Sequence, residues 1–350
     1  MFITKQESGE LDASLPARAA LATRKPANAS KGRPPRTVVS RRVRRPLPSA
    51  LHGDAHTSKG TIASTPASVI KGKLRIIPVG GLEEVGRNMT VLEYENDIIV
   101  IDMGLQFPEE NMPGVDYIIP NISYLIPRRK NIRGVVITHA HYDHIGGIPH
   151  IMSRLGNAIP MFATDITAAI IKKRQDDFEH IAGTLNIREI TNNTRIKLGV
   201  FEVTFFGVSH NVPGSVGVVV KTPAGIVVHT GDFKLDLKSD IAGKTEIEKI
   251  KALGEKHVLV LMSDSTNARE PGHQFSEREI KTELETIIAN TKGRLIIGTF
   301  ASLLGRLQQI IQLAERHKKK VVIEGRSMRS NIEIAQQLGY MKFEKNTIIP

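Results

Sequence analysis

The pattern of hydrophobic positions changes abruptly near residue 73. From there to residue 229, short runs rich in β-branched residues are separated by turn residues, and two stretches at 148–155 and 166–174 are typical of helices. The runs predict strands at 74–80, 89–94, 98–102, 133–138, 159–163, 201–208, 215–221 and 225–229. Strands mixed with helices and hairpins indicate a layered α/β fold with a mixed sheet.

After residue 258 the alternation becomes more regular. Ser276 and Glu279 form a capping box, which marks the start of a helix. The pattern predicts strands at 258–262, 295–299 and 321–324, and helices at 276–290, 303–317 and 331–338. Because strands and helices follow one another in turn, we expect βα units of a parallel sheet and a second domain in this part of the chain.

The first 72 residues have a different composition. Residues 1–73 contain 14 Lys or Arg and 4 Asp or Glu, so most of the net charge of +12 lies there. A composition rich in Ala, Ser, Pro and Arg, with Phe2 as the one aromatic residue and no sustained periodicity, predicts a disordered basic extension. Its clusters at 31–36 and 41–46 would attract nucleic-acid phosphates without sequence preference. An inert solvated tail and an organelle transit peptide are the alternatives, and acidic residues near the start count against the second.

Composition limits the chemistry that the chain can perform. Cysteine is absent, so a disulfide framework and a thiolate metal site are excluded, and any metal must be held by His and carboxylate side chains. No apolar run reaches the roughly 18 residues that a membrane-spanning helix needs, and the first residues lack the apolar region of a signal peptide. We therefore expect a cytoplasmic protein with no membrane partner.

Four metal-ligand side chains fall within six residues at the end of the predicted strand 133–138. They are His139, His141, Asp143 and His144. Imidazole and carboxylate ligands suit zinc, manganese or iron. A catalytic ion keeps one position open, so four ligands from one loop indicate two adjacent metals, one on the first two residues and one on the last two. A solvated, His-rich surface loop is the alternative, and the order at a strand end argues against it.

Three further polar residues also end apolar strands. They are Asp102, His210 and Asp232. Taken singly, each has a simpler explanation as a turn, cap or exposed residue. Together with the His-rich loop, however, these strand ends can converge on one edge of a sheet sandwich.

With these residues in place, the chain resembles the metallo-β-lactamase superfamily, and within its β-CASP nuclease group the ribonuclease J family. The resemblance covers roughly residues 74–350. Apart from the metal loop, the matching segments are 80–89, 111–120, 230–234, 263–268 and 325–328. It implies an αββα sandwich at 73–265, here incomplete, with an inserted β-CASP α/β domain, partly present at 266–350.

The resemblance also implies roles for the site residues. One metal would be held by His139, His141 and His210, the second by Asp143 and His144, and Asp232 would bridge both. Asp143 and Asp232 would be the catalytic carboxylates, and Asp102 would orient a ligand imidazole. The expected cofactors are two divalent ions, with Zn²⁺ preferred over Mn²⁺.

The activity implied is hydrolysis of RNA phosphodiester bonds, both 5′-to-3′ and internally, in RNA maturation and mRNA decay. Arg326, Ser327 and Ser302 are candidates for RNA binding, the first two at a helix N-terminus or in a plain turn. A homo-oligomer (dimer or tetramer) or other RNA-decay proteins are the expected partners. The alternatives are a small-molecule hydrolase of the same superfamily, a DNA-directed β-CASP nuclease, and an inactive RNA-binding or partner subunit.

The chain departs from the family pattern in two places and at its end. Leu303 and Gly214 stand where the family usually has Asn and Asp. A 5′-phosphate-binding segment, a last ligand His and the return of the chain to the first domain would follow Pro350 in the family. We therefore expect a fragment that binds at least one metal and has little or no nuclease activity.

Overall fold

A six-stranded sheet is formed by strands between residues 74 and 190. The computed structural model describes residues 2–5, 71–178, 183–235, 244–272 and 274–349. The sheet has the order β2-β3-β4-β5-β6-β7, antiparallel from β2 to β4 and parallel from β4 to β7. Its strands are β2 (Leu74–Gly80), β3 (Met89–Tyr94), β4 (Asp97–Ile101), β5 (Ile132–Val136), β6 (Met161–Thr164) and β7 (Ile187–Ile190).

A five-stranded sheet follows, in the order β12-β11-β10-β9-β8. It is antiparallel except where β12 runs parallel to β11. Its strands are β8 (Arg195–Leu198), β9 (Phe201–Gly207), β10 (Val216–Thr222), β11 (Gly225–His229) and β12 (Val258–Met262). The strand at 258–262 therefore belongs to this sheet and not to the C-terminal one.

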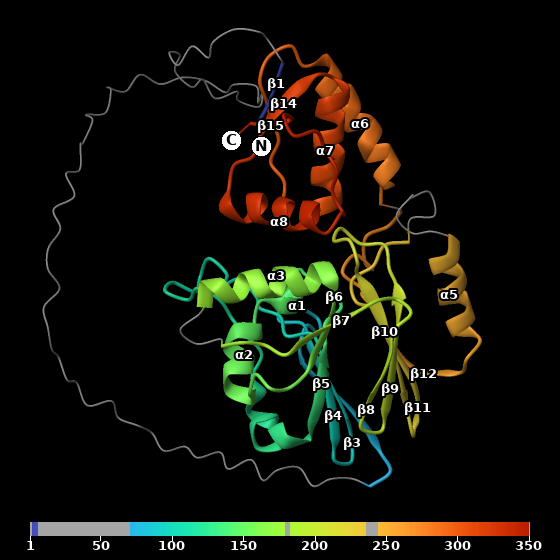
Figure 1. Ribbon diagram of the computed structural model, residues 1–350. Helices are drawn as coiled ribbons and strands as arrows, with labels where there is room; N and C mark the ends of the chain where they lie inside the picture. Colours follow the sequence, from blue (N-terminus) through green and yellow to red (C-terminus); the bar gives the residue numbers. More distant parts are fainter. Residues whose placement is uncertain (1, 6–70, 179–182, 236–243, 273, 350) are drawn as a thin grey trace, which may run out of the picture. The chain divides into compact units, whose positions relative to one another are not determined.

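The two sheets form the inner layers of a four-layer sandwich (Figure 1). Their facing sides share one apolar core, which includes Leu92, Ile99, Phe201 and Val218. Helices α1 (Tyr142–Ile145), α2 (Ile148–Leu155) and α3 (Asp165–Gln175) cover the outer face of the six-stranded sheet, and α5 (Lys244–Gly254) covers the other sheet. The arrangement is thus αββα, as predicted. Short 3-10 helices lie at η1 (Ile122–Tyr124), η2 (Ile126–Asn131) and η3 (Asp176–Phe178).

The C-terminal part has its own sheet, in the order β13-β1-β14-β15. Its strands are β1 (Phe2–Lys5), β13 (Leu295–Ile296), β14 (Lys319–Val322) and β15 (Ile348–Ile349), and its helices are α6 (Glu277–Asn290), α7 (Leu304–Arg316) and α8 (Arg326–Gln337). The capping box predicted for α6 is present, because Ser276 Oγ accepts from Glu279 N–H and Glu279 Oε2 accepts from Ser276 N–H.

Three further details of the prediction were wrong. Residues 2–5 form β1, antiparallel to both β13 and β14, instead of belonging to a disordered extension. The aromatic and β-branched run Phe2-Ile3-Thr4 suits a strand but is too short to show periodicity. Because β1 lies between them, β13 and β14 do not pair directly. Finally, α8 begins at Arg326 and not at 331, directly after the positive φ of Gly325.

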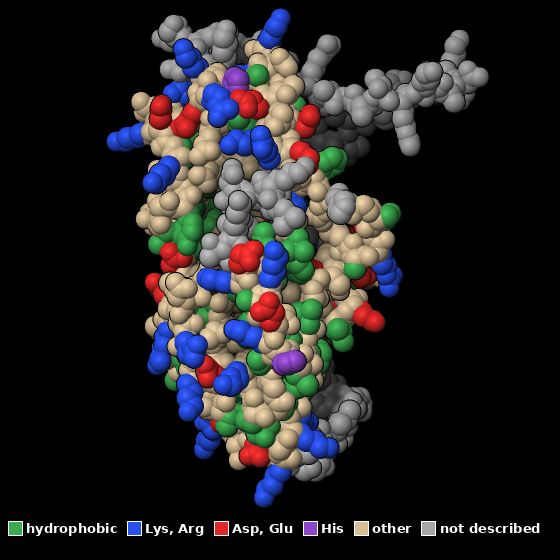
Figure 2. Space-filling view, turned by 90° about the vertical axis from the view of Figure 1, so that its right-hand side faces the viewer, with side chains coloured by type: hydrophobic (Ala, Val, Ile, Leu, Met, Phe, Trp, Pro, Cys, Tyr) green, Lys and Arg blue, Asp and Glu red, His purple; other side chains and the backbone are tan. Residues whose placement is uncertain are grey.

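The remaining sequence expectations for the extension, including its basic clusters at 31–36 and 41–46, lie outside the described residues. On the face shown in Figure 2, Lys and Arg side chains are interspersed with Asp and Glu and do not gather in one region. Among the helices that the structure describes, none is long and apolar enough to cross a membrane.

Helices α3 and α8 lie antiparallel, with polar contacts at both ends. Tyr340, just after α8, donates a hydrogen bond to Asp165 Oδ1 at the start of α3 (2.7 Å). At the other end, Arg326 lies 3.9 Å from Asp177, just after α3. Burial and this bond to Asp165 raise the pKa of Tyr340, so the hydroxyl keeps its proton.

Candidate metal centre

The predicted ligands follow the ends of strands from both sheets. Asp102 follows β4, the His-rich loop follows β5, and His210 and Asp232 follow β9 and β11. The two sheets are tied together here, since Val216 N–H donates to Thr138 O at 3.0 Å. This arrangement brings side chains from distant parts of the sequence to one edge of the sandwich.

The first ligand group consists of His139, His141, His210 and Asp232. One ligand atom from each lies within 4.8 Å of all the others. His141 Nδ1 and His210 Nε2 are 3.0 Å apart, and Asp232 Oδ2 lies 3.8 Å from Nε2 of both His139 and His210. Three imidazoles and one carboxylate at this spacing can surround a single ion.

The second ligand group consists of Asp143, His144 and Asp232, whose ligand atoms also lie within 4.8 Å of one another. His144 Nε2 is 3.2 Å from Asp232 Oδ1 and 3.5 Å from Asp143 Oδ2. Asp232 therefore turns one carboxylate oxygen toward each group. This is the geometry that a carboxylate bridging two ions requires.

Asp102 stands behind these groups and contacts no other predicted ligand than His144. Its carboxylate is buried and accepts hydrogen bonds from Thr138 N–H, from the Thr138 hydroxyl and from His144 Nδ1, each at 2.8 Å. Asp102 has a φ of 62°, in the left-handed region that a non-glycine residue adopts at some energetic cost. The bond from Nδ1 directs His144 Nε2 toward the two ligand carboxylates.

The hydrogen bonds around Thr138 show that His139 can serve as a metal ligand. The Thr138 hydroxyl has one proton, which it donates to Asp102, so it accepts from His139 Nδ1 at 3.0 Å. With its proton on Nδ1, His139 presents an unprotonated Nε2. This atom is buried and has no hydrogen-bond partner in the structure. A metal ion would satisfy it, so the residues fit the cofactor that the fold implies.

The histidines of the first ligand group are kept neutral. Burial, reinforced by the neighbouring imidazoles, holds the pKa of His139 well below its usual range and lowers that of His141 to about 4. Burial likewise lowers the pKa of His210. A neutral imidazole keeps the lone pair that a metal needs.

The second ligand group, unlike the first, carries charges on its histidine and its carboxylates. Burial alone would lower the pKa of His144, but the charge and hydrogen bond of Asp102 outweigh it and raise this pKa well above 6.5. Burial alone would raise the pKa values of the Asp143 and Asp232 carboxylates, but their hydrogen bonds with His144 have the larger effect. The pKa of Asp143 is therefore lowered, and the pKa of Asp232 is lowered to about 2. Without metal, a protonated His144 therefore balances the carboxylates.

Three residues that support the site were not predicted. Asn88 Nδ2 lies 3.3 Å from Asp143 Oδ2 and 3.1 Å from His144 Nε2. His229 Nδ1 accepts from Gly231 N–H at 3.0 Å and thus fixes the turn before Asp232. Gly104 passes so close to the metal loop that an added Cβ would lie 1.6 Å from Asp143 O. Asn88 belongs to the segment 80–89 already noted for its resemblance, which was the one available signal.

The predicted RNA-binding residues lie in the C-terminal part. Arg326 and Ser327 are exposed in the first turn of α8. Ser302 is half-buried in the loop before α7, and this loop is tied to α8 because Asn331 Nδ2 donates to Ala301 O at 3.0 Å. The three residues thus belong to neighbouring segments, and their role in binding RNA stays a prediction.

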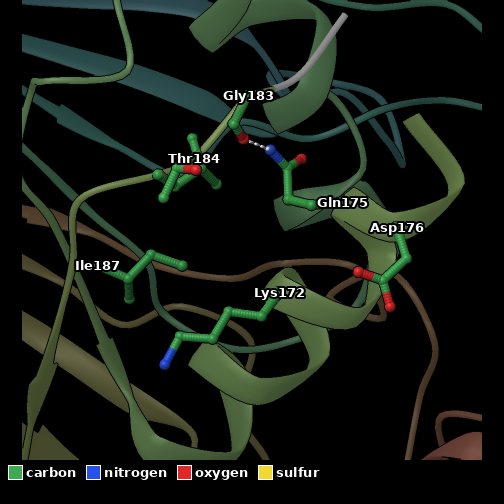
Figure 3. A pocket seen from close by; sticks show the side chains of 7 residues that line it. Lys172, Gln175, Asp176, Gly183, Thr184 and Ile187 are labelled. Carbon is green, nitrogen blue, oxygen red and sulfur yellow. Dashed lines mark hydrogen bonds between the residues drawn. The ribbon is translucent and has the colours of Figure 1, made fainter. Parts of the chain in front are cut away.

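A surface pocket of about 440 Å³ lies at the end of α3, away from the ligand groups (Figure 3). Lys172, Gln175 and Asp176 line it from the helix side, and Thr184 and Ile187 from the segment leading into β7. None of its lining residues belongs to either ligand group. The pocket is therefore not the candidate metal centre.

Comparison with known proteins agrees with this geometry. Residues 113–273 match the β-lactamase superfamily domain, and residues 292–350 match the ribonuclease J β-CASP domain. Ribonuclease J of Thermus thermophilus is 42% identical over 77% of this chain and 48% of its own length, and ribonuclease J2 of Bacillus subtilis is 37% identical over 79% and 49%. The chain thus spans about half the length of these relatives.

A solved structure agrees at the level of the fold. A protein of unknown function from Enterococcus faecalis superimposes with a TM-score of 0.59 at 18% identity, over 79% of this chain and 73% of that one. The fold is that of the metallo-β-lactamases, with a β-CASP domain in the C-terminal part. The chain therefore belongs to the ribonuclease J family of the β-lactamase superfamily.

Proposed function

We propose that this chain supplies the metal centre of a ribonuclease that hydrolyses RNA phosphodiester bonds, both from the 5′ end and internally, in RNA maturation and mRNA decay. One observation carries the proposal. Two ligand groups share Asp232, in a chain whose residues 292–350 match a ribonuclease domain. A small-molecule hydrolase needs the ligand groups but has no use for that domain.

The proposed roles follow from the charges in the site. Zn²⁺, or Mn²⁺ as the second candidate, would when bound lower the pKa of water and offset charge on the phosphoryl oxygens. Neutral His139, His141 and His210 would donate their nitrogen lone pairs to an ion in the first ligand group. Asp143 and Asp232 are ionised at neutral pH because their pKa values are lowered. As the catalytic carboxylates, they would supply the negative charge that binds the ions and would fix the positions of the ions relative to His144.

His144 is a ligand whose orientation depends on its neighbour. The Asp102 carboxylate accepts a hydrogen bond from His144 Nδ1–H, so His144 Nε2 faces the second ligand group. Away from the centre, Arg326, Ser327 and Ser302 would contact the phosphates of the RNA, Arg326 as a fully charged donor.

Further parts of the proposal concern organisation. We place the metallo-β-lactamase-like domain at 73–265 and the β-CASP part at 266–350, after a basic extension at 1–72. A cytoplasmic homo-oligomer, or an assembly with other RNA-decay proteins, is the proposed setting. The matches of residues 113–273 and 292–350 to the two family domains support the placement of the domains.

The direct test is cleavage of a 5′-monophosphorylated, fluorescently labelled RNA under single-turnover conditions with Zn²⁺ or Mn²⁺. We expect slow, metal-dependent cleavage, well below that of the Thermus thermophilus relative, since Asp143, His144 and Asp232 are the only described ligands of the second group. Asp143→Asn should abolish it. His317→Ala is the matched control, because His317 contacts Glu285 outside the centre.

Two results would overturn the proposal. Faster hydrolysis of a lactone or thioester than of RNA, with the same metal, would favour a small-molecule hydrolase. RNA cleavage that Asp143→Asn leaves unchanged would show that the described ligand groups are not its source.

A further inference from the structure

Four aromatic rings form a continuous strip beside the metal loop. Tyr117 stacks on His150 with ring centroids 4.5 Å apart, and His150 meets Phe178 edge-on at 4.9 Å. The Arg174 guanidinium connects this set to the fourth ring, because it lies 5.1 Å from the Phe178 centroid and 4.4 Å from that of Tyr142. We call these five residues the aromatic strip.

The strip ends at the metal centre itself. Tyr142 stands between His141 and Asp143, which belong to the two ligand groups. Its carbonyl accepts hydrogen bonds from Leu105 N–H and Gly146 N–H at 3.0 and 2.7 Å, so its backbone is fixed. Arg174 is fixed as well, since its Nη2 donates to Gly146 O at 3.1 Å. Tyr142 and Arg174, at the end of the strip that lies in the metal loop, are therefore held to the same backbone segment.

The exposure of the two tyrosines argues against a purely structural role. Tyr117 is 38% exposed and Tyr142 is 36% exposed, whereas Phe201 in the core between the sheets is fully buried. Packing favours burial of such large apolar surfaces. Exposed rings held in place beside a catalytic centre are typical of surfaces that bind flat ligands.

The charges beside the strip indicate which part of a nucleic acid it would contact. Exposed Asp116 precedes Tyr117, and exposed Asp177 precedes Phe178. These carboxylates would disfavour phosphates along the strip itself, and Arg326, 3.9 Å from Asp177, would contact the phosphates beside it. The uncharged faces of nucleobases, by contrast, stack on tyrosine rings and on guanidinium planes.

We propose that the aromatic strip binds unpaired nucleobases of single-stranded RNA by stacking and guides the strand into the metal centre. This rests on the proposed ribonuclease function and adds a binding site to it. Stacking is tolerant of sequence, because every base has a π-face. The strip therefore selects single strands over duplexes, in which the bases are already stacked on one another.

The test compares Tyr142→Leu and Tyr117→Leu with the wild-type chain. Each variant keeps an apolar side chain of similar size but loses the ring. The probe is a single-stranded RNA carrying 2-aminopurine, whose fluorescence reports stacking, beside the same RNA with an abasic site. We expect each variant to weaken binding of the base-containing RNA on the order of tenfold, to reduce the fluorescence change, and to leave binding of the abasic RNA unchanged.

Two controls separate stacking from structural damage. Tyr94→Leu makes the same change at the far end of the β3–β4 hairpin, where Tyr94 pairs with Asp97, and should bind RNA as the wild type does. The zinc content of both strip variants should equal that of the wild type. The slope of log affinity against log salt should also stay constant, because no phosphate contact is removed.

The outcomes distinguish this proposal from the one on which it rests. If the wild-type chain binds no RNA, the ribonuclease function and the strip fail together. If the wild type binds RNA but both variants bind it equally well, the strip alone is overturned. Equal weakening for base-containing and abasic RNA would also overturn it.

Discussion

Replacing Asp102 with Asn should weaken binding of the second metal while leaving that of the first unchanged. The carboxylate accepts three hydrogen bonds of 2.8 Å, two from Thr138 and one from His144 Nδ1. An Asn side chain of the same shape has one acceptor oxygen and one amide group that can only donate. Whichever way the amide turns, at least one of the present donors meets another donor.

The least costly rearrangement moves the proton of His144. If Nδ1 gives up its proton, it can accept from the Asn amide, and the proton then resides on Nε2. This nitrogen faces Asp143 and Asp232, so the second ligand group loses its imidazole lone pair. Changes of this kind behind a ligand reduce metal affinity by about 10- to 100-fold. One lost hydrogen bond to a charged group should also destabilise the metal-free fold by about 1.5–3 kcal/mol.

The assay is equilibrium dialysis against Zn²⁺ with measurement of metal per chain, together with urea unfolding of the metal-free protein. Asp97→Asn is the matched control, because the Asp97 carboxylate also accepts hydrogen bonds, from Val200 N–H and Arg133 Nε, but lies at the opposite, solvent-exposed end of β4. It should lose stability and keep both metals. Two metals at wild-type affinity in Asp102→Asn would refute the reasoning.

The further predictions concern the ligand groups, the residues that support them and the cap of α6. Gly104→Ala should displace the metal loop, because its Cβ would overlap Asp143 O, and metal titration should show weaker binding of the second ion. As pH rises through neutrality, binding of the second ion should strengthen, since the metal must displace the proton that the raised pKa keeps on His144. The first ligand group, with the pKa of His141 at about 4, should bind equally well from pH 8 down to roughly 6, as calorimetry can check. Ser276→Ala should remove the cap of α6 and cost about 1 kcal/mol in urea unfolding, without changing metal content.

Metal-free stability should depend on pH in two opposite ways. His144 has a raised pKa, so its contribution is complete below about pH 6.5 and is lost as pH rises through the folded value. Asp232 has a pKa lowered to about 2, so its contribution is complete above about pH 4 and is lost as pH falls toward 2. His139, His141 and His210 have lowered pKa values, so their contributions are complete above about pH 6.5 and are lost as pH falls below it. Unfolding free energies should therefore be highest near neutral pH.

The strand ends explain why so much of the centre could be predicted. Apolar runs predicted β4, β5, β9 and β11, and a polar residue within three positions of a strand end lies close to an edge of its sheet. Asp102, His139, His210 and Asp232 occupy that kind of position. Their convergence required only that the sheets pack face to face, which the mixture of strands and helices already indicated.

Other parts of the site depend on tertiary contacts that no local pattern records. Asn88 and Gly104 lie in loops whose paths are set by pairing with the metal loop: Asn88 N–H donates to Asp143 O, and Met103 N–H donates to His144 O. The role of Thr138 depends on the left-handed backbone of Asp102, which brings the carboxylate back toward it.

The same reason accounts for the elements that were missed. β7 and β8 are four residues long and largely exposed, so they lack an apolar run. β1 is formed by residues more than 290 positions from its partner Ile296, and no local pattern connects them. Each of these segments becomes a strand because a neighbouring strand supplies its hydrogen-bond partners. That pairing depends on the fold and cannot be read from the segment's own sequence.

The measurement that tests the central claim most directly is anomalous diffraction at the zinc edge from crystals of the zinc-loaded chain. The account predicts two peaks. One should lie among His139 Nε2, His141 Nδ1 and His210 Nε2, the other between Asp143 and His144 Nε2, with one oxygen of Asp232 facing each. Zinc bound elsewhere, or no peak between these side chains, would contradict it.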